Sequence, residues 1–146
     1  MTVRLEHVEP IAAEADRVWP FFRWDNLAAM RPGGFFADVA YQERRAVPGA
    51  IRVVTLGTGA RLVERLDEED AAARRLTYTM LETGGVPIVN YRGLVVVAPA
   101  GSDACRVTFA CECAPVGITD AAWRELWVGM QVANAAFVRA EVTRAR

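Results

Sequence analysis

The 146-residue chain contains no lysine, one histidine and three cysteines. All 17 of its cationic side chains are therefore arginines, which excludes Schiff-base chemistry on a lysine amine. So few histidines and cysteines argue against a zinc site built from protein ligands, and we expect no metal and no other cofactor. The 18 acidic side chains bring the net charge to −1, which argues against a nucleic-acid-binding protein because such proteins carry basic patches.

Long apolar runs are also missing. The longest, Leu94–Ala98, is far too short to cross a bilayer, and Met1–Pro10 lacks the apolar core of a signal peptide. All three cysteines lie on one predicted strand, where Cys111 and Cys113 point the same way and would not bridge easily. We therefore expect a cytoplasmic protein with reduced cysteines that act as small hydrophobes. A thiol nucleophile is the alternative, although the only histidine, His7, lies far away in the sequence.

The composition is that of one globular domain. Hydrophobic residues make up 53% of the chain and charged residues 24%, and no linker or repeat interrupts residues 1–146. Alternating apolar residues predict a first strand at Val3–Ile11. Asp16 can cap a short helix that runs through Phe22, and Asp25 can cap a second one that Pro32-Gly33-Gly34 ends.

Six further strands are predicted, because short alternating stretches are separated by turn-forming clusters. They span Phe36–Glu43, Ile51–Leu56, Ala60–Asp67, Arg75–Glu82, Ile88–Val97 and Arg106–Ala114. The connections are short, which indicates antiparallel neighbours. Between two of these strands, Gly57-Thr58-Gly59 precedes no helix that could hold a phosphate. The acidic run Asp67–Asp70 is predicted to form a solvated hairpin turn.

A long amphipathic helix is predicted at Asp120–Arg144, capped by Thr119 or Asp120. Its apolar stripe consists of Trp123, Leu126, Trp127, Met130, Ala133, Phe137 and Ala140. The opposite side carries Arg124, Gln131 and Arg139. The stripe needs an apolar partner, and only the inner face of the sheet is large enough. The sequence thus predicts an α+β fold in which a curved, seven-stranded antiparallel sheet grips this helix, with space for a pocket between them.

Glu64 is the most informative single residue. Strand alternation places it on one face with Ala60, Leu62 and Leu66, in a row that is otherwise apolar. Burying an isolated carboxylate is costly and would raise its pKa unless partners offset the desolvation. One interpretation is a functional carboxylate in a cavity. The other is that Glu64 is partly exposed or paired with an arginine.

Three other polar or small residues fall on apolar faces. One face of the strand at 88–97 is predicted to carry Val89, Tyr91, Gly93, Val95 and Val97, and the other Ile88, Asn90, Arg92, Leu94 and Val96. Gly93 in mid-strand marks a bend or the close approach of a ligand. Tyr91 offers a hydroxyl to a ligand, or it is a core tyrosine whose hydroxyl reaches water. Asn134 lies on or beside the helix stripe, either as a buried amide that needs partners or as a boundary residue. The predicted outer face of this strand is partly apolar, so the protein is expected to be either a monomer or a homodimer.

Three further residues receive less weight. Tyr78 alternates with Leu76 and Met80 in a half-buried strand, which favours core packing, although Tyr78 is kept as a candidate cavity residue. His7 is interpreted as structural, even though histidine is the residue type whose unperturbed pKa suits proton transfer near neutrality. Glu112 is expected on the outer face unless a bulge reverses that strand.

Three segments carry a family resemblance. They are Ile11-x-Ala13-x-Ala15-Asp16-x-Val18-Trp19, Glu64-Arg65-Leu66-Asp67 and Asn90-Tyr91-Arg92. With the order of the elements, they resemble the START-like (SRPBCC) superfamily, which includes the birch-pollen-allergen fold, polyketide cyclase/dehydrase proteins and plant abscisic-acid receptors. The resemblance covers nearly the whole chain and implies a helix-grip fold with a cavity for a small hydrophobic ligand.

In the hormone-receptor branch of that superfamily, the residues that match Glu64, Tyr91 and Asn134 line the cavity. That branch also pairs a lysine with the carboxylate of its ligand, and this chain has no lysine. Leu56–Ala60 replaces the gate loop of the branch, and Gly85–Val89 replaces its latch segment. The resemblance therefore implies neither abscisic acid as the ligand nor a receptor role.

Two functions follow as expectations. A carrier or sensor would hold a neutral or weakly polar lipid, polyketide or aromatic compound, oriented by Glu64, Tyr91 and Asn134. A cyclase/dehydratase-like enzyme would use Glu64 as general base, Tyr91 as donor to the developing oxyanion and Asn134 to position the carbonyl. The predicted lining also includes Tyr78, Gly93, Trp127, Met130 and Phe137. A chaperone or partner-binding module that uses the outer surface is the third possibility.

Overall fold

The computed structural model describes residues 1–33 and 36–144. Its strands are β1 (Val3–Ile11), β2 (Phe36–Tyr41), β3 (Ile51–Leu56), β4 (Arg61–Asp70), β5 (Arg75–Glu82), β6 (Ile88–Pro99) and β7 (Cys105–Pro115). Its helices are α1 (Ala15–Val18), the 3-10 helices η1 (Trp19–Phe21) and η2 (Trp24–Gly33), and α2 (Asp120–Arg144). The predicted order of one strand, two short helical segments, six strands and one long helix is confirmed, with α1 and the directly following η1 together forming the first segment.

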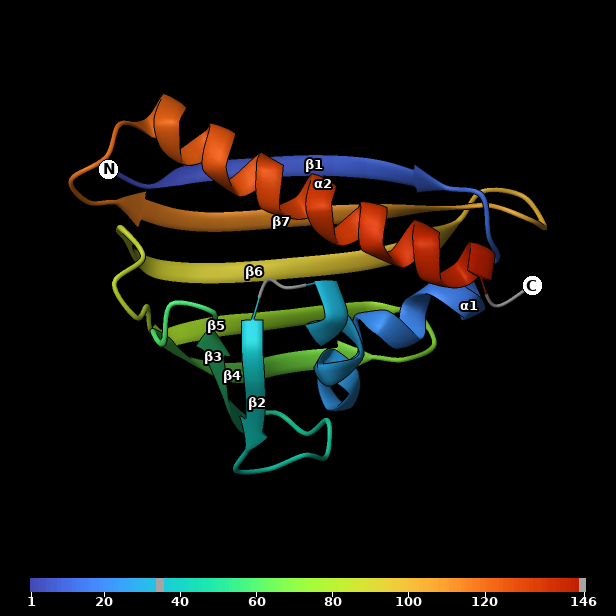
Figure 1. Ribbon diagram of the computed structural model, residues 1–146, viewed down its shortest axis with the longest axis horizontal. Coiled ribbons are helices and arrows are strands. Elements are labelled where there is room, and N and C mark those ends of the chain that lie inside the picture. The colour runs from blue at the N-terminus through green and yellow to red at the C-terminus, as the bar shows by residue number, and fades with distance from the viewer. Residues whose placement is uncertain (34–35, 145–146) are drawn as a thin grey trace.

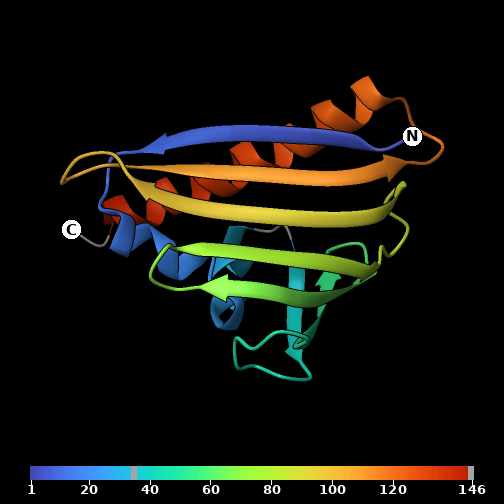
Figure 2. The same cartoon turned by 180° about the vertical axis from the view of Figure 1, so that it is seen from behind.

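The seven strands form one antiparallel sheet in the order β1-β7-β6-β5-β4-β3-β2. The sheet is strongly curved, so that β2 and β3 turn steeply away from the direction of β1, β7 and β6 (Figure 1). Helix α2 crosses the concave face on a diagonal over β1, β7 and β6. Seen from behind, the other face of the sheet is free of helices in the part of the chain described (Figure 2). This is the predicted helix-grip fold.

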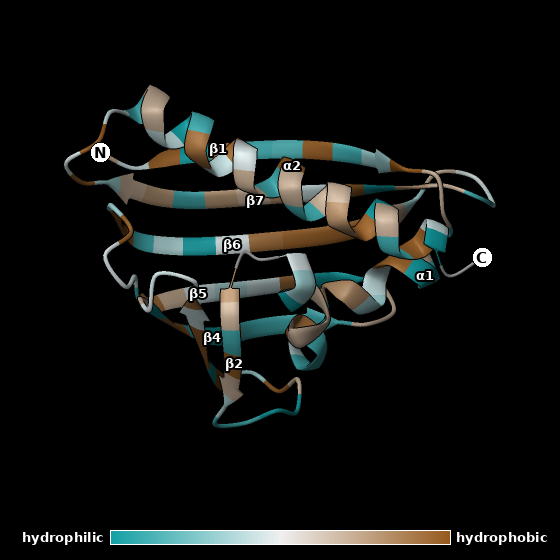
Figure 3. Cartoon of the chain, in the orientation of Figure 1, coloured by the Kyte–Doolittle hydropathy of each residue, from teal (hydrophilic) through white to brown (hydrophobic). Residues whose placement is uncertain are grey.

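Helix α2 begins and ends where the sequence predicts. Thr119 caps it, because its Oγ1 accepts a hydrogen bond from the backbone N–H of Ala122 at 3.1 Å. The buried positions are Trp123, Trp127, Ala135, Val138 and Val142. Helix α2 lies over a sheet in which the second half of β6 is strongly hydrophobic (Figure 3). The predicted stripe was therefore wrong in part, since Leu126, Ala133 and Ala140 are exposed. A stripe spaced every 3.5 residues drifts around a straight helix of 3.6 residues per turn.

The structure overturns three other expectations. Strand β4 continues to Asp70, so the acidic run is not the turn, and Glu69 within it accepts a hydrogen bond from the backbone N–H of Trp24 at 2.8 Å. Asp16 does not cap α1, since no side chain does; it lies in the first turn and binds Arg74 at 2.8 Å. Asp25 does not cap η2, which begins at Trp24.

The second short helix also ends close to where the sequence predicts. Helix η2 ends at Gly33, within the predicted stop at 32–34, of which Gly34 lies outside the described residues.

A β-bulge changes the faces of β6. Its pairing with β7 shifts register between Val89 and Arg92, and Asn90 between them adopts a left-handed φ of 56°. Ile88 is consequently buried, whereas Val89 is 45% exposed, which is the reverse of the predicted assignment. Tyr91 faces inward as expected.

The structure also tests the expectations for the three cysteines and for a membrane-spanning helix. Cys105, Cys111 and Cys113 are buried and free, as predicted. Burial raises the pKa of the Cys111 thiol to about 12, with the neighbouring Cys113 adding to the effect, so that this thiol stays protonated at neutral pH and is a poor nucleophile. None of the helices in the described part of the chain is long and apolar enough to span a bilayer.

Candidate functional site: a cavity between the sheet and helix α2

A cavity of about 480 Å³ lies between the inner face of the sheet and α2. Its apolar walls come from Phe22, Leu27, Met30, Phe36, Val54, Leu56, Leu62, Leu76, Met80, Val86, Ile88, Val95, Phe109, Trp123, Trp127 and Met130. Its polar side chains are Arg52, Thr58, Glu64, Tyr78, Tyr91, Gln131 and Asn134. The volume and the sparse polar groups are those of a small-molecule site.

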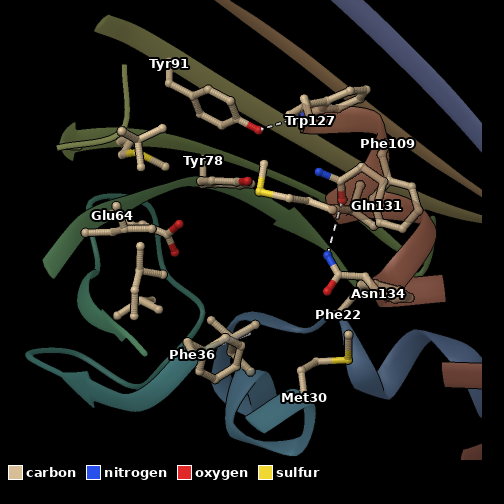
Figure 4. Close-up of a pocket in the computed structure, with 18 of the residues that line it drawn as sticks. Phe22, Met30, Phe36, Glu64, Tyr78, Tyr91, Phe109, Trp127, Gln131 and Asn134 are labelled. Carbon is tan, nitrogen blue, oxygen red and sulfur yellow. Dashed lines mark hydrogen bonds between the residues drawn. The ribbon is translucent and has the colours of Figure 1, made fainter. Parts of the chain in front are cut away.

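The cavity is closed on different sides by different elements. Phe22, Met30 and Phe36 lie across the cavity from Tyr91 (Figure 4). Thr58 in the turn between β3 and β4 and Val86 in the turn between β5 and β6 also contribute to the lining. The segments 56–60 and 85–89 therefore both contribute to the cavity lining.

Glu64 points its carboxylate into the cavity from β4 (Figure 4). Arg52, directly opposite on β3, donates from Nε to Oε1 of Glu64 at 2.8 Å. Both side chains are buried, with exposures of 8% for Glu64 and 4% for Arg52. The structure therefore shows the pairing with an arginine that was one alternative, and it also places Glu64 in the cavity lining, as the other alternative requires.

Trp24 holds the guanidinium of Arg52 in place. Arg52 donates from Nη1 to the backbone carbonyl of Trp24 at 2.9 Å, and its Cζ lies 4.1 Å from the centre of the indole ring. The same carbonyl accepts a hydrogen bond from the hydroxyl of Tyr41 at 2.7 Å, and the Trp24 indole N–H donates to the carbonyl of Glu43. Trp24 is fully buried, so its contacts hold the side chain of Arg52, and with it the ion pair, in one position.

Two tyrosines lie together on the sheet side of the cavity. The ring centres of Tyr78 and Tyr91 are 6.0 Å apart, and the indole N–H of Trp127 donates to the hydroxyl oxygen of Tyr91 at 3.1 Å. Burial raises the pKa of Tyr78, and the negative charge of Glu64 raises it further. Burial likewise raises the pKa of Tyr91 well above its usual range. Both hydroxyls therefore keep their protons at neutral pH and can act as hydrogen-bond donors.

Helix α2 adds two amides to the cavity. Asn134 donates from Nδ2 to Oε1 of Gln131 at 3.3 Å, and both side chains are half-buried (Figure 4). Asn134 was expected on or beside the apolar stripe. Gln131 was expected on the opposite side of the helix, and this expectation is wrong because the buried face follows the 3.6-residue turn through Trp127, Gln131 and Asn134.

Six of the eight predicted ligand-binding residues line the cavity: Glu64, Tyr78, Tyr91, Trp127, Met130 and Asn134. Gly93 is not among the lining residues, because the ring of Tyr78 covers it; a Cβ at Gly93 would lie 2.4 Å from that ring. Phe137 lies further along α2, where its ring packs edge-on against Phe21.

His7 and Glu112 lie outside the cavity. The Nε2 atom of His7 is 3.1 Å from a carboxylate oxygen of Glu9, whose other oxygen contacts Arg139 of α2 at 3.3 Å. This placement agrees with a structural histidine. Glu112 lies on the outer face, where it pairs with Arg4 at 3.1 Å.

Arg52 is the site residue that the sequence interpretation missed. A signal was available, because Arg52 alternates with Val54 and Leu56 in the same way that Glu64 alternates with Leu62 and Leu66. Two oppositely charged residues in the apolar rows of adjacent strands predict a pair across those strands.

Comparison with known proteins places the fold. Residues 2–143 match the model of a protein family described as polyketide cyclase/dehydrase and lipid transport. The chain resembles the XoxI protein of Bacillus cereus with a TM-score of 0.82 at 17% identity, covering 95% of this chain and 94% of that one. It resembles norcoclaurine synthase of Thalictrum flavum, solved in complex with dopamine and hydroxybenzaldehyde, with a TM-score of 0.74 at 22% identity, covering 100% of this chain and 89% of that one. An uncharacterised protein from Bacillus thuringiensis gives 0.81 at 17% identity, with coverage of 95% and 98%. Comparison with curated protein sequences gives no match.

Proposed function

The chain belongs to the polyketide cyclase/dehydrase and lipid transport family, and we propose that it binds a small, largely apolar molecule between the sheet and α2. The cavity of about 480 Å³ carries this proposal. Each 100 Å² of apolar ligand surface that enters it contributes roughly 2.5 kcal/mol of favourable free energy. The polar groups of Glu64, Tyr78 and Asn134 then fix the orientation of the ligand.

Filling the cavity tests the proposal. Val95 lines the cavity and is half-buried, so Val95→Trp places an indole in the ligand's space. Val132 is 43% exposed on α2 and does not line the cavity, so Val132→Trp is the matched control. The probe is the uncharged dye N-phenyl-1-naphthylamine, whose fluorescence rises in apolar surroundings.

The wild type and Val132→Trp should bind the dye, and Val95→Trp should bind it at least about tenfold more weakly, a loss of about 1.4 kcal/mol. Circular dichroism verifies that both variants are folded. Equal dye binding by the two tryptophan variants would show that the dye binds elsewhere and would contradict the proposal.

Catalysis is a second candidate, favoured by the convergence of Glu64 and Tyr78 on one cavity (Figure 4). Arg52 occupies Oε1 of Glu64, and among the described residues Oε2 has no hydrogen-bond donor. In a cyclase/dehydratase-like reaction, Oε2 would accept a proton from an acidic C–H group. The hydroxyls of Tyr78 and Tyr91 would donate hydrogen bonds to the resulting enolate oxygen.

Proton exchange separates the enzyme from the carrier. The probe is 2-tetralone in heavy water, in which NMR follows loss of the signal from the hydrogens beside the carbonyl. A general base at Glu64 predicts that Glu64→Gln lowers the exchange rate about 100-fold or more, with binding of 2-tetralone changed only a few-fold. The surface variant Glu112→Gln is the control and should exchange like the wild type. Equal exchange rates for the wild type and Glu64→Gln would contradict the catalytic role and leave the carrier as the remaining candidate function.

A further inference from the structure

The ion pair between Arg52 and Glu64 is unusual because it lies in the wall of a cavity that is otherwise uncharged in the described part of the chain. Among the described residues that line the cavity, these two alone carry a formal charge. They contact each other at 2.8 Å across directly opposed positions of β3 and β4. The polar groups that remain are neutral: they belong to Thr58, Tyr78, Tyr91, Gln131 and Asn134. The lining is therefore electrically balanced before any ligand enters.

We propose that Glu64 acts as an internal counter-ion to Arg52, so that the cavity rejects carboxylate ligands and selects an uncharged ligand whose hydroxyl group donates to Glu64. This inference rests on the proposed ligand-binding function. It adds the charge of the ligand and names Arg52 as a residue that determines specificity.

The contacts of Arg52 disfavour a bidentate contact with an anion. Its Nε donates to Glu64, its Nη1 donates to the carbonyl of Trp24, and one face of the guanidinium lies on the indole of Trp24. To engage a ligand carboxylate through both Nε and Nη2, Arg52 would have to release Glu64 from Nε and leave that carboxylate buried without a partner. Such an unpaired buried charge is strongly unfavourable.

An anionic ligand would also lie close to the carboxylate of Glu64. Two negative charges between largely apolar walls repel each other more than they do in bulk water. A hydroxyl, by contrast, can donate to Oε2 of Glu64, which no described donor occupies, and a hydrogen bond to an ionised acceptor is a strong one. The same geometry thus disfavours the acid and favours the alcohol.

Two probes built on the same bicyclic ring test the inference. At neutral pH, 2-naphthol is an uncharged donor and 2-naphthoate is an anion, and both carry the same bicyclic ring. Isothermal titration calorimetry of the wild type should give an affinity for 2-naphthol about tenfold or more above that for 2-naphthoate, which corresponds to about 1.4 kcal/mol.

The variant Glu64→Gln keeps an acceptor for Arg52 and removes the negative charge. It should raise the affinity for 2-naphthoate and lower that for 2-naphthol, so that the preference is reversed. Glu112→Gln changes the net charge by the same amount, but at an outer-face ion pair with Arg4, and it should keep the preference of the wild type. An equal effect of the two variants would overturn the inference, because the cause would then be net charge.

Arg52→Gln provides the opposite test and does not depend on the folding of Glu64→Gln. With the cation removed, 2-naphthoate should bind even more weakly, and the cation 2-naphthylmethylammonium should bind more tightly than it does to the wild type. Tighter binding of 2-naphthoate by Arg52→Gln would overturn the inference.

Measurements on the wild type distinguish failure of the charge selection from failure of the proposed ligand binding. Equal affinity for 2-naphthol and 2-naphthoate, with N-phenyl-1-naphthylamine still bound, would refute the charge selection alone. Failure to bind any of the three would refute the ligand-binding function itself.

Discussion

Gly93 makes space for the ring of Tyr78, and replacing it with alanine should move that ring. The two residues are directly paired across β5 and β6. A Cβ at Gly93 would lie 2.4 Å from Cε1 and Cζ of Tyr78 and 2.6 Å from its hydroxyl oxygen. Carbon atoms in ordinary contact are roughly 3.5 Å apart, so the ring must shift by about 1 Å. Because the sheet backbone lies beneath it, we expect the shift to be toward the cavity.

The expected cost in stability combines two opposing effects. Overpacking of this size costs about 1–3 kcal/mol. Alanine at a position with an ordinary φ restricts the unfolded chain and returns about 0.4–1 kcal/mol, and Gly93 is not among the residues with a positive φ. Gly93→Ala should therefore lower the free energy of unfolding by about 1 kcal/mol. It should also weaken binding of N-phenyl-1-naphthylamine, because Tyr78 then takes up part of the cavity.

A double-mutant cycle in urea identifies the cause. In a Tyr78→Leu background the ring is absent, so Gly93→Ala should lose its destabilising effect and give a coupling energy of about 1 kcal/mol or more. Fluorescence titration of the same four proteins follows dye binding. If Gly93→Ala destabilises the Tyr78→Leu protein as much as the wild type, contact with Tyr78 is not the reason for glycine at this position.

Three further predictions concern stability, each measured by urea unfolding. Gly129→Ala lies in the helix interior where a Cβ meets no atom within 4 Å, and it should stabilise the protein by about 1 kcal/mol; a loss would contradict the open space there. Thr119→Ala removes the acceptor for the N–H of Ala122 and should lower the free energy of unfolding by about 1 kcal/mol. Thr119→Ser keeps a hydroxyl acceptor and should retain most of that stability. Burial raises the pKa values of Cys111 and Tyr78, so the unfolded chain ionises first as the pH rises. The free energy of unfolding should accordingly be constant near neutrality and fall above about pH 9; a rise there would contradict the assigned burial.

Much of the site follows from the alternation of side chains along strands. That rule places Glu64 and Tyr78 on the inner face, and the spacing of apolar and capping residues fixes both ends of α2. The rule holds where pairing is regular. It would have found Arg52 as well, because Arg52 shares its row with Val54 and Leu56.

The remainder depends on interactions that one strand or helix does not contain. Asn90 adopts a left-handed conformation in a bulge, and this single extra residue exchanges the faces of Ile88 and Val89. Strand β4 continues through its acidic run, where Glu69 meets the backbone of Trp24 from a distant segment. The local sequence predicts neither feature, because both depend on contacts with other segments of the chain that lie alongside.

The pairing of β1 with β7 has a consequence for how the protein folds. Every other pair of adjacent strands is joined by a short connection, whereas this pair unites residues as far apart as Val3 and Cys113. Closing so long a loop has a large entropic cost before any contact compensates for it. We therefore expect the hairpins from β2 to β7 to assemble early and β1 to join at a late, rate-limiting step.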